Sequence, residues 1–334
     1  RKVVSRKAVS CPTRHPSDTL PPYRKREITK MASGAGALTK YKMFIGGKWV
    51  DSASGETFES FNPYTAKPWA LIPKGNADDV ERAVEAADQA FNSGDWPALT
   101  ATARGHMIRR FADLITENAD ELAEIEVRDN GKLIAEMSAQ CKYLTQWYYY
   151  YAGLCDKVEG SVIPIDKPGH FNYTVWEPLG VCACIVPWNS PLLLLAWKLA
   201  PLLAAGNTAV IKPSEYTSAS TLEFMKIAEQ VFPPGVVNVV TGFGAEAGGP
   251  LVDHPKVAKV AFTGSDATGA AIYAQAAKHM KKVTMELGGK SPNIVFADAH
   301  IDNAVKGVIS GIFAATGQTC IAGSRLLVQE SIHD

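Results

Sequence analysis

Cysteine is scarce in this chain. Six cysteines among 334 residues do not make a disulfide framework, and their spacing forces no pairing. The composition therefore fits a reducing compartment of the cell. Cys182 and Cys184 lie in the apolar run 180–186, so we expect both to be ordinary buried strand residues. The seven histidines never fall at metal-ligand spacing, and we predict no metal site.

Long apolar runs and an excess of one charge are also missing. The longest apolar stretch, residues 191–206, contains Lys198 and Pro201 and is shorter than the ~20 residues that a bilayer requires. We expect no membrane span. The chain holds 34 basic and 34 acidic residues, and beyond position 30 it is mildly acidic. It therefore has no excess of positive charge with which to bind nucleic acid.

The first 30 residues differ from the rest, because they hold nine Lys or Arg side chains and two acidic ones. Pro12, Pro16, Pro21 and Pro22 would interrupt the amphipathic helix of a mitochondrial presequence. We favour additional sequence ahead of a natural start at Met31, and a transit peptide is the alternative. In both cases we predict that residues 1–40 are poorly ordered.

Short strands and then helices are predicted in the first part of the remaining chain. With 46% hydrophobic residues, the chain is long enough for two domains. Residues 43–50 and 56–62 have the pattern of an early hairpin with glycines at its turn. Asn76 is placed to cap a helix whose apolar residues recur every three or four positions. Further helices are predicted over residues 104–117, 119–129 and 133–154.

Strands and helices alternate in the second half of the chain. Apolar runs at residues 181–186, 208–211, 236–240, 257–262 and 282–286 are separated by helical stretches. This alternation is typical of the βαβ units of a parallel, doubly wound sheet. The predicted fold class is therefore α/β, with a Rossmann-like cofactor domain.

Two glycine-rich loops that follow predicted strands could hold a phosphate. Gly242–Ala247 imitates the dinucleotide fingerprint, and Phe262–Gly269 also lies between a strand and a helix. The first loop matches the pattern better, but it lacks a clear acidic residue about 20 positions further on. The pattern alone leaves the two loops in competition.

Polar residues also follow predicted strands at the edge of the sheet where ligands bind. Lys212 and Glu215 come directly after the strand at residues 208–211, and an exposed ion pair is the alternative interpretation. Asn189 follows another strand, and it could simply cap the helix that Pro191 would begin.

Two segments near the C-terminal end carry residues suited to acyl chemistry through a thioester. Glu286 lies in Met285–Pro292, and Cys320 lies in Gly317–Cys320. A thiolate is the nucleophile in such chemistry, and a Glu can activate the water that releases the acid. Both segments match the signatures of the NAD(P)-dependent aldehyde dehydrogenase superfamily without a gap. The chain resembles that superfamily over residues 41–334.

The resemblance implies a hydrolytic, non-acylating aldehyde dehydrogenase that converts an aldehyde to a carboxylic acid with NAD. Cys320 would form a thiohemiacetal and then a thioester, and the Asn189 side chain and the Cys320 amide would hold the oxyanion. Glu286 would activate the hydrolytic water. Lys198 would belong to a proton path near Glu286. The alternative is a lysine whose aliphatic chain is buried and whose ammonium group lies in water.

The resemblance also implies cofactor and substrate positions. It selects the second glycine loop for NAD and leaves the first as a peripheral contact. Lys212 and Glu215 would bind the ribose hydroxyls, and the Glu disfavours a 2′-phosphate, so NAD is expected over NADP. The implied cofactor-binding residues are Ile185, Val186, Trp188, Lys212, Glu215, Gly242, Gly264, Ser265, Gly269 and Leu287, and the substrate would contact Leu194, Trp197, Thr319 and Ile321.

The same resemblance divides the chain into domains. Residues 41–156 and 178–286 would form the NAD-binding domain, and residues 157–177 a projecting β-hairpin for oligomerisation. Residues 287–334 would be the start of a second α/β catalytic domain. Because members of the superfamily continue far beyond the catalytic Cys, the chain is expected to be C-terminally truncated and inactive by itself.

Two alternatives stay open, a CoA-acylating aldehyde dehydrogenase and an inactive nucleotide-binding fragment. Members of the CoA-acylating branch generally lack the Glu base, so Glu286 argues against that reading. The full-length protein is expected to act on a small aldehyde, without nucleic-acid or membrane partners, as a homodimer or homotetramer. A cytoplasmic location is expected, or a mitochondrial one if residues 1–30 are a transit peptide.

Overall fold

The computed structural model describes residues 38–333 of the chain. The predicted leader therefore lies outside the described residues, apart from its last three positions. Two of these, Thr39–Lys40, form strand β1, which pairs in parallel with β5 (Lys67–Pro73). For these two residues the expectation of poor order is wrong, because they extend a sheet.

A seven-stranded sheet forms the centre of the fold, and its strand order is β10-β9-β6-β7-β8-β2-β3. The first five strands are parallel, and they confirm the doubly wound α/β fold. Strands β7 and β8 extend to one side of β6, whereas β9 and β10 extend to the other, so the strand order reverses beside β6. The parallel strands are β6 (Val181–Ile185), β7 (Thr208–Lys212), β8 (Val237–Val239), β9 (Val257–Thr263) and β10 (Lys282–Glu286).

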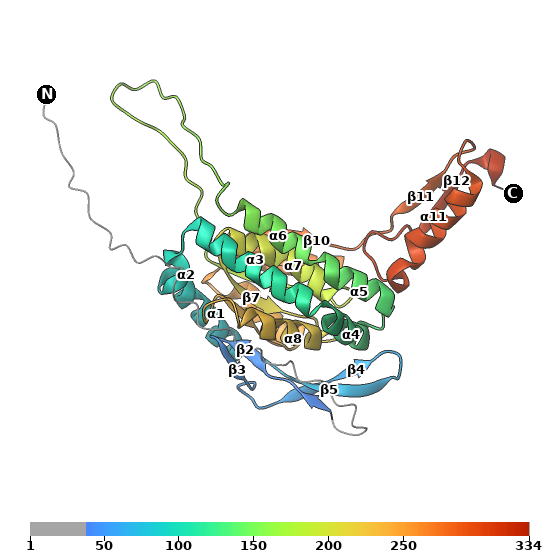
Figure 1. Cartoon of the computed structure of the whole chain (residues 1–334), viewed down its shortest axis with the longest axis horizontal. Helices are drawn as coiled ribbons and strands as arrows, with labels where there is room; N and C mark the ends of the chain where they lie inside the picture. Colours follow the sequence, from blue (N-terminus) through green and yellow to red (C-terminus); the bar gives the residue numbers. More distant parts are fainter. Residues whose placement is uncertain (1–37, 334) are drawn as a thin grey trace, which may run out of the picture. The chain divides into compact units, whose positions relative to one another are not determined.

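Helices cover both faces of this sheet and give it two apolar cores. On one of these faces α3, α6 and α7 lie side by side (Figure 1). Strands β6 and β7 are buried at every position, which explains their continuous apolar sequences. Cys182 and Cys184 belong to the core on one face, and both are free buried thiols as predicted. Their neighbours Val181, Ala183 and Ile185 belong to the core on the other face.

The helices follow the predicted pattern with one subdivision. Asn76 caps α1 through a capping box with Asp79, as predicted. The helix predicted over residues 133–154 is divided at Leu144, where Trp147 N–H bonds back three residues to the Leu144 carbonyl. The helices are α1 (Ala77–Asn92), α2 (Asp95–Ala98), α3 (Ala101–Glu117), α4 (Ala119–Asn130), α5 (Ile134–Tyr143), α6 (Thr145–Leu154), α7 (Pro191–Ala204), α8 (Ser218–Ala228), α9 (Gly249–Asp253), α10 (Asp266–Ala277) and α11 (Ile301–Phe313).

The early hairpin is two hairpins rather than one. Strands β2 (Met43–Ile45) and β3 (Lys48–Val50) are joined by two glycines, as predicted. Strand β4 (Thr57–Asn62) pairs instead with β5, a strand that the sequence analysis missed. The Asn62 side chain accepts a hydrogen bond from Tyr64 N–H, and this Asx turn reverses the chain into β5.

Residues 157–177 turn back on themselves at one antiparallel bridge, Val162 to Tyr173. Backbone hydrogen bonds of 2.9 Å from Ile163 to Asn172 and from Thr174 to Ser161 flank this bridge. Its role in oligomerisation, like the division of the chain into domains, stays a prediction.

The last described segment is a small βαβ unit. Strands β11 (Pro292–Val295) and β12 (Arg325–Val328) pair in parallel, and α11 lies between them in sequence. Every residue of α11 is at least partly exposed. Among the helices of residues 38–333, none has both the length and the apolar character for a membrane crossing.

Candidate active site

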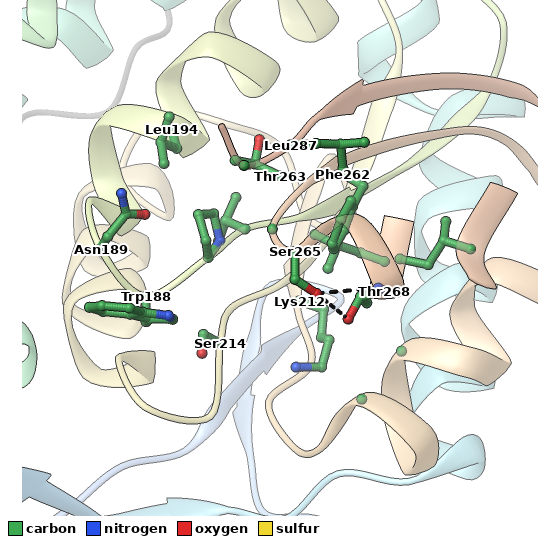
Figure 2. Close-up of a pocket in the computed structure, with 18 of the residues that line it drawn as sticks. Trp188, Asn189, Leu194, Lys212, Ser214, Phe262, Thr263, Ser265, Thr268 and Leu287 are labelled. Carbon is green, nitrogen blue, oxygen red and sulfur yellow. Dashed lines mark hydrogen bonds between the residues drawn. The ribbon is translucent and has the colours of Figure 1, made fainter. Parts of the chain in front are cut away.

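A cavity of about 1000 Å³ lies at the carboxyl ends of β6, β7 and β9, where the strand order reverses (Figure 2). Ligands of open parallel sheets bind at this edge. Most residues that the resemblance singled out line this cavity. They are Ile185, Val186, Trp188, Asn189, Leu194, Lys212, Glu215, Gly264, Ser265, Leu287, Thr319 and Cys320.

Both glycine loops line the cavity, although the sequence pattern offered them as alternative phosphate-binding loops. Gly264 and Ser265 precede α10, and the Ser265 hydroxyl accepts a hydrogen bond of 3.2 Å from Thr268 N–H (Figure 2). Gly244 of the other loop and Gly248, which follows that loop, line the cavity as well. Backbone N–H groups at a helix start suit a phosphate, because they carry a partial positive charge.

Two of the singled-out glycines lie behind the cavity wall and serve close packing. A Cβ atom on Gly242 would lie 2.7 Å from the Gly75 carbonyl oxygen. A Cβ atom on Gly269 would lie 2.6 Å from Leu287 Cδ2. Gly269 therefore leaves room for Leu287, whose side chain faces the cavity (Figure 2).

Lys212 and Glu215 lie side by side at one end of the cavity. The Lys212 side chain is buried, and its Nζ lies 2.9 Å from the Pro213 carbonyl and 3.7 Å from Glu215 Oε2. Burial lowers the pKa of Lys212, whereas the Glu215 carboxylate acts in the opposite direction. A buried cation beside a half-exposed carboxylate gives this end of the cavity one strong donor and one strong acceptor.

Cys320 and Asn189 line the same cavity from distant parts of the chain. The side-chain amide of Asn189 donates a hydrogen bond of 2.9 Å to the Gln318 carbonyl. Just before Gln318, Ala315 and Thr316 have φ values of 53° and 55°, in the left-handed region. The backbone is strained there, as is common at functional sites.

Glu286, Lys198 and Trp197 line a second cavity of about 520 Å³. Side chains alternate along β10, so Glu286 and Leu287 point to opposite faces of the sheet. Lys198 is buried beside Thr263 Oγ1; burial lowers its pKa, whereas the charges of Cys184 and Glu286 oppose this. The structure thus brings Asn189 and Cys320 together and directs Glu286 to the other cavity.

Two residues near the nucleophile segment differ from the sequence analysis, one predicted there and one missed. Ile321, a predicted substrate contact, is 77% exposed and lies outside the residues that line the cavity. Lys132 is buried, and its Nζ donates a hydrogen bond of 3.0 Å to Ser190 Oγ. The run 129–132 (DNGK) predicts a helix end and a turn, so no local signal marks Lys132 as part of a site.

Comparisons with known proteins agree on one family. The aldehyde dehydrogenase family pattern matches residues 49–334. The chain is 51% identical over 298 residues to the (Z)-2-((N-methylformamido)methylene)-5-hydroxybutyrolactone dehydrogenase of Acinetobacter baylyi, covering 89% of this chain and 61% of that protein. It is 46% identical over 297 residues to the mitochondrial aldehyde dehydrogenase family 2 member B4 of Arabidopsis thaliana, covering 88% and 55%.

A solved structure shares the fold. The NAD+ complex of an aldehyde dehydrogenase from Bacillus cereus superimposes with a TM-score of 0.85 at 44% identity, over 87% of this chain and 60% of that one. The chain therefore spans less than two thirds of the length of each of these relatives.

Proposed function

Because the chain belongs to the aldehyde dehydrogenase family, we propose that the full-length protein oxidises an aldehyde to a carboxylic acid with NAD as the electron acceptor. One observation carries this proposal. A thiol, an amide donor and two glycine loops with a helix start line a single cavity at the switch point of a parallel sheet.

The residues of the cavity fit a dinucleotide. Gly264, Ser265 and the first turn of α10 would hold the phosphates, with Gly244 and Gly248 opposite. The cavity is large enough for both nucleotide halves. At Gly244 the backbone is open to approach, because no atom lies within 4 Å of a Cβ built there.

Lys212 and Glu215 would bind the hydroxyls of the adenosine ribose. An ammonium and a carboxylate 3.7 Å apart can donate to one hydroxyl and accept from the other. The carboxylate would also repel a 2′-phosphate, which favours NAD over NADP.

The chemistry begins at Cys320. Its thiolate attacks the aldehyde carbon, a C–S bond forms, and the carbonyl electron pair moves to oxygen. Asn189 and the Cys320 N–H would stabilise this oxyanion, and one such donor is typically worth about 3 kcal/mol of barrier. NAD, when bound, accepts the hydride that leaves the aldehyde carbon. The acyl group then stays on the sulfur as a thioester until water releases the carboxylic acid.

Glu286 is the proposed base for that water, and Lys198 the proposed start of its proton path. Their electrostatic interaction supports the second role, because the Glu286 charge raises the pKa of Lys198 against the effect of burial. For the first role, the carboxylate has to turn from the second cavity past the end of β10. Gly288 and Gly289 follow one residue later, after Leu287, and give the chain freedom at that point.

The substrate would enter beside Leu194 and Thr319, which line the cavity near the thiol. Apolar contacts of this kind favour an aliphatic or aromatic aldehyde. The buried Ser190 and Lys132 add polar groups behind Asn189.

Self-association would use residues 157–177. This segment exposes apolar side chains that a monomer would leave in water, and a second copy would bury them. They are Val158, Val162, Ile163, Ile165, Phe171, Tyr173, Val175 and Trp176. The free cysteines of the described residues support a reducing compartment such as the cytoplasm.

A panel of aldehydes assayed with the full-length protein tests the proposal, with NADH or NADPH absorbance followed in parallel. We expect aldehyde-dependent reduction of NAD, a weaker response with NADP, and none from Cys320→Ala. An equal rate from Cys320→Ala would exclude the thiol mechanism. If the protein binds NAD but no aldehyde causes NADH to form, the proposal is wrong and the protein is a nucleotide-binding unit.

A further inference from the structure

One polar side chain of the dinucleotide cavity has no part in the function proposed above. Gln275 lines the cavity from the third turn of α10, and its side chain is half-buried. Ser265, where the phosphates would bind, is the N-cap of the same helix. Ten residues of an α-helix span about 15 Å, so Gln275 lies in a part of the cavity well beyond the phosphates.

The side-chain amide of Gln275 is held by a second wall of the cavity. Its Nε2 donates a hydrogen bond of 3.1 Å to the carbonyl oxygen of Gly249, the first residue of α9. The nitrogen and the oxygen of an amide point in different directions, so this bond also fixes the orientation of Oε1. None of the described residues 38–333 donates a hydrogen bond to Oε1. Gln275 therefore keeps one acceptor for a ligand of the cavity.

The lining of the cavity around Gln275 is otherwise apolar. Two segments line it there, residues 244–249 and the second and third turns of α10. Gln275 carries the only polar side chain among their lining residues; the others are Gly244, Ala245, Gly248, Gly249, Ala271 and Ile272. Apolar walls with one placed polar group are typical of a ligand site, because the walls contact the ligand and the polar group orients it. Walls of glycine and alanine leave room for a flat ring.

This part of the cavity adjoins the proposed ribose site. A Cβ atom on Gly248 would lie 3.6 Å from Lys212 Cδ, so Gly248 packs against the Lys212 side chain. The next residue, Gly249, accepts the hydrogen bond from Gln275. A base attached to a ribose at Lys212 and Glu215 would therefore lie between Gly248 and α10, within reach of Gln275.

We propose that Gln275 selects the base of the dinucleotide: its Oε1 accepts a hydrogen bond from the exocyclic amino group of adenine. The inference rests on the proposed function, because it needs a dinucleotide whose ribose lies at Lys212. Adenine carries a donor at this position, whereas hypoxanthine carries a carbonyl oxygen there. Two acceptors that face each other form no hydrogen bond, so the site discriminates between two bases of nearly the same shape.

The test compares two dinucleotides that differ in this group, NAD and nicotinamide hypoxanthine dinucleotide. Calorimetry with the full-length protein gives the Kd of each. For the wild type we expect NAD to bind about five- to tenfold more tightly, which is the difference that one partly solvated hydrogen bond makes.

Gln275→Met keeps the length of the side chain and removes the acceptor. We expect its two Kd values to agree within about twofold, because neither base finds a partner. Gln275→Ala should behave in the same way. Gln230→Met is the matched control, because Gln230 is exposed just after α8 and also donates to a backbone carbonyl, that of Lys226, at 2.8 Å. Its preference for NAD should equal that of the wild type.

The ratio of the two Kd values separates base recognition from a structural role. If Gln275 only joined α9 to α10, its replacement would weaken the binding of both dinucleotides alike and leave the ratio unchanged. Equal affinities in the wild type would overturn the inference, as would a folded Gln275→Met or Gln275→Ala variant that keeps the wild-type preference.

Aldehyde-dependent NADH formation in the same samples tests the proposed function separately. A preference for NAD that is lost in Gln275→Met, in a protein that oxidises no aldehyde, would count against the proposed function alone. An active enzyme whose Gln275 variants keep the wild-type preference would count against Gln275 alone.

Discussion

The side-chain amide of Asn189 donates a 2.9 Å hydrogen bond to the carbonyl oxygen of Gln318, although 129 positions separate the two residues. The contact joins the loop after β6 to the segment after α11, so the amide and the Cys320 thiol face one cavity. A side-chain amide donor and a nucleophile that line one cavity are what oxyanion stabilisation requires.

Replacing Asn189 by alanine should therefore slow the reaction with the aldehyde. The oxyanion would lose a donor, and we expect kcat for NADH formation to fall by about 10²–10³-fold with a smaller change in KM. Steady-state absorbance measures this. Asn92→Ala, on the exposed end of α1, is the matched control and should behave like the wild type. A nearly unchanged kcat in Asn189→Ala would remove Asn189 from the oxyanion site.

Glu286→Gln separates the two halves of the reaction. If Glu286 activates water, the first turnover should keep its rapid NADH burst, while steady turnover slows by about 10²–10⁴-fold. Rapid mixing followed by steady-state absorbance distinguishes the phases. Equal steady rates for variant and wild type would mean that the carboxylate stays in the second cavity with Lys198 during catalysis.

Gly269→Ala should weaken NAD binding without unfolding the protein. The new methyl group would lie 2.6 Å from Leu287 Cδ2, so Leu287 has to move at the cavity wall. We expect the Kd for NAD, measured by calorimetry, to rise severalfold. Gly307→Ala in α11 is the control, because its Cβ has no neighbour within 4 Å and should leave the Kd unchanged. Equal affinities for the two variants would contradict this packing argument.

Two buried carboxyl groups should make stability fall as the pH rises. Burial raises the pKa of Glu126 and of Asp129 to about 7 each. Unfolded, they titrate near pH 4 (about 4.3 and 3.9), so between about pH 4 and pH 7 the folded chain holds more protons than the unfolded one. The free energy of unfolding should decline through this window, by up to about 1.4 kcal/mol per pH unit for each group, and level off above it.

Urea unfolding at several pH values measures that slope. Asp129→Asn removes one group while it keeps an acceptor for the Ala219 and Ser220 N–H groups, so the slope should become shallower. Glu59→Gln, an exposed carboxyl on β4, is the control and should leave the slope unchanged. An identical slope in Asp129→Asn would show that Asp129 is ionised throughout.

The parallel strands could be predicted from the sequence because their burial on both faces leaves continuous apolar runs. Strand β5 was missed because its alternation is irregular, and because the Asx turn at Asn62 was not used as a signal. Lys212 and Asn189 could be predicted from the sequence because ligands bind where parallel strands end. Cys320 could be predicted because its segment matches the family signature.

Other parts of the site depend on contacts that carry no local pattern. The face to which Glu286 points is set by the register of β10 against β9, which composition does not encode. The pair of Lys132 and Ser190 spans 58 positions and joins a helix end to a helix start. Only the packing of α4 against the corner before α7 brings them together.

The most direct test of the account is a crystal structure of the chain with NAD bound. In that complex we expect the adenosine ribose at Lys212 and Glu215, the phosphates at Ser265, and the nicotinamide ring in the part of the cavity that contains the Cys320 sulfur. A dinucleotide bound elsewhere, or a nicotinamide ring separated from that sulfur by the sheet, would contradict it.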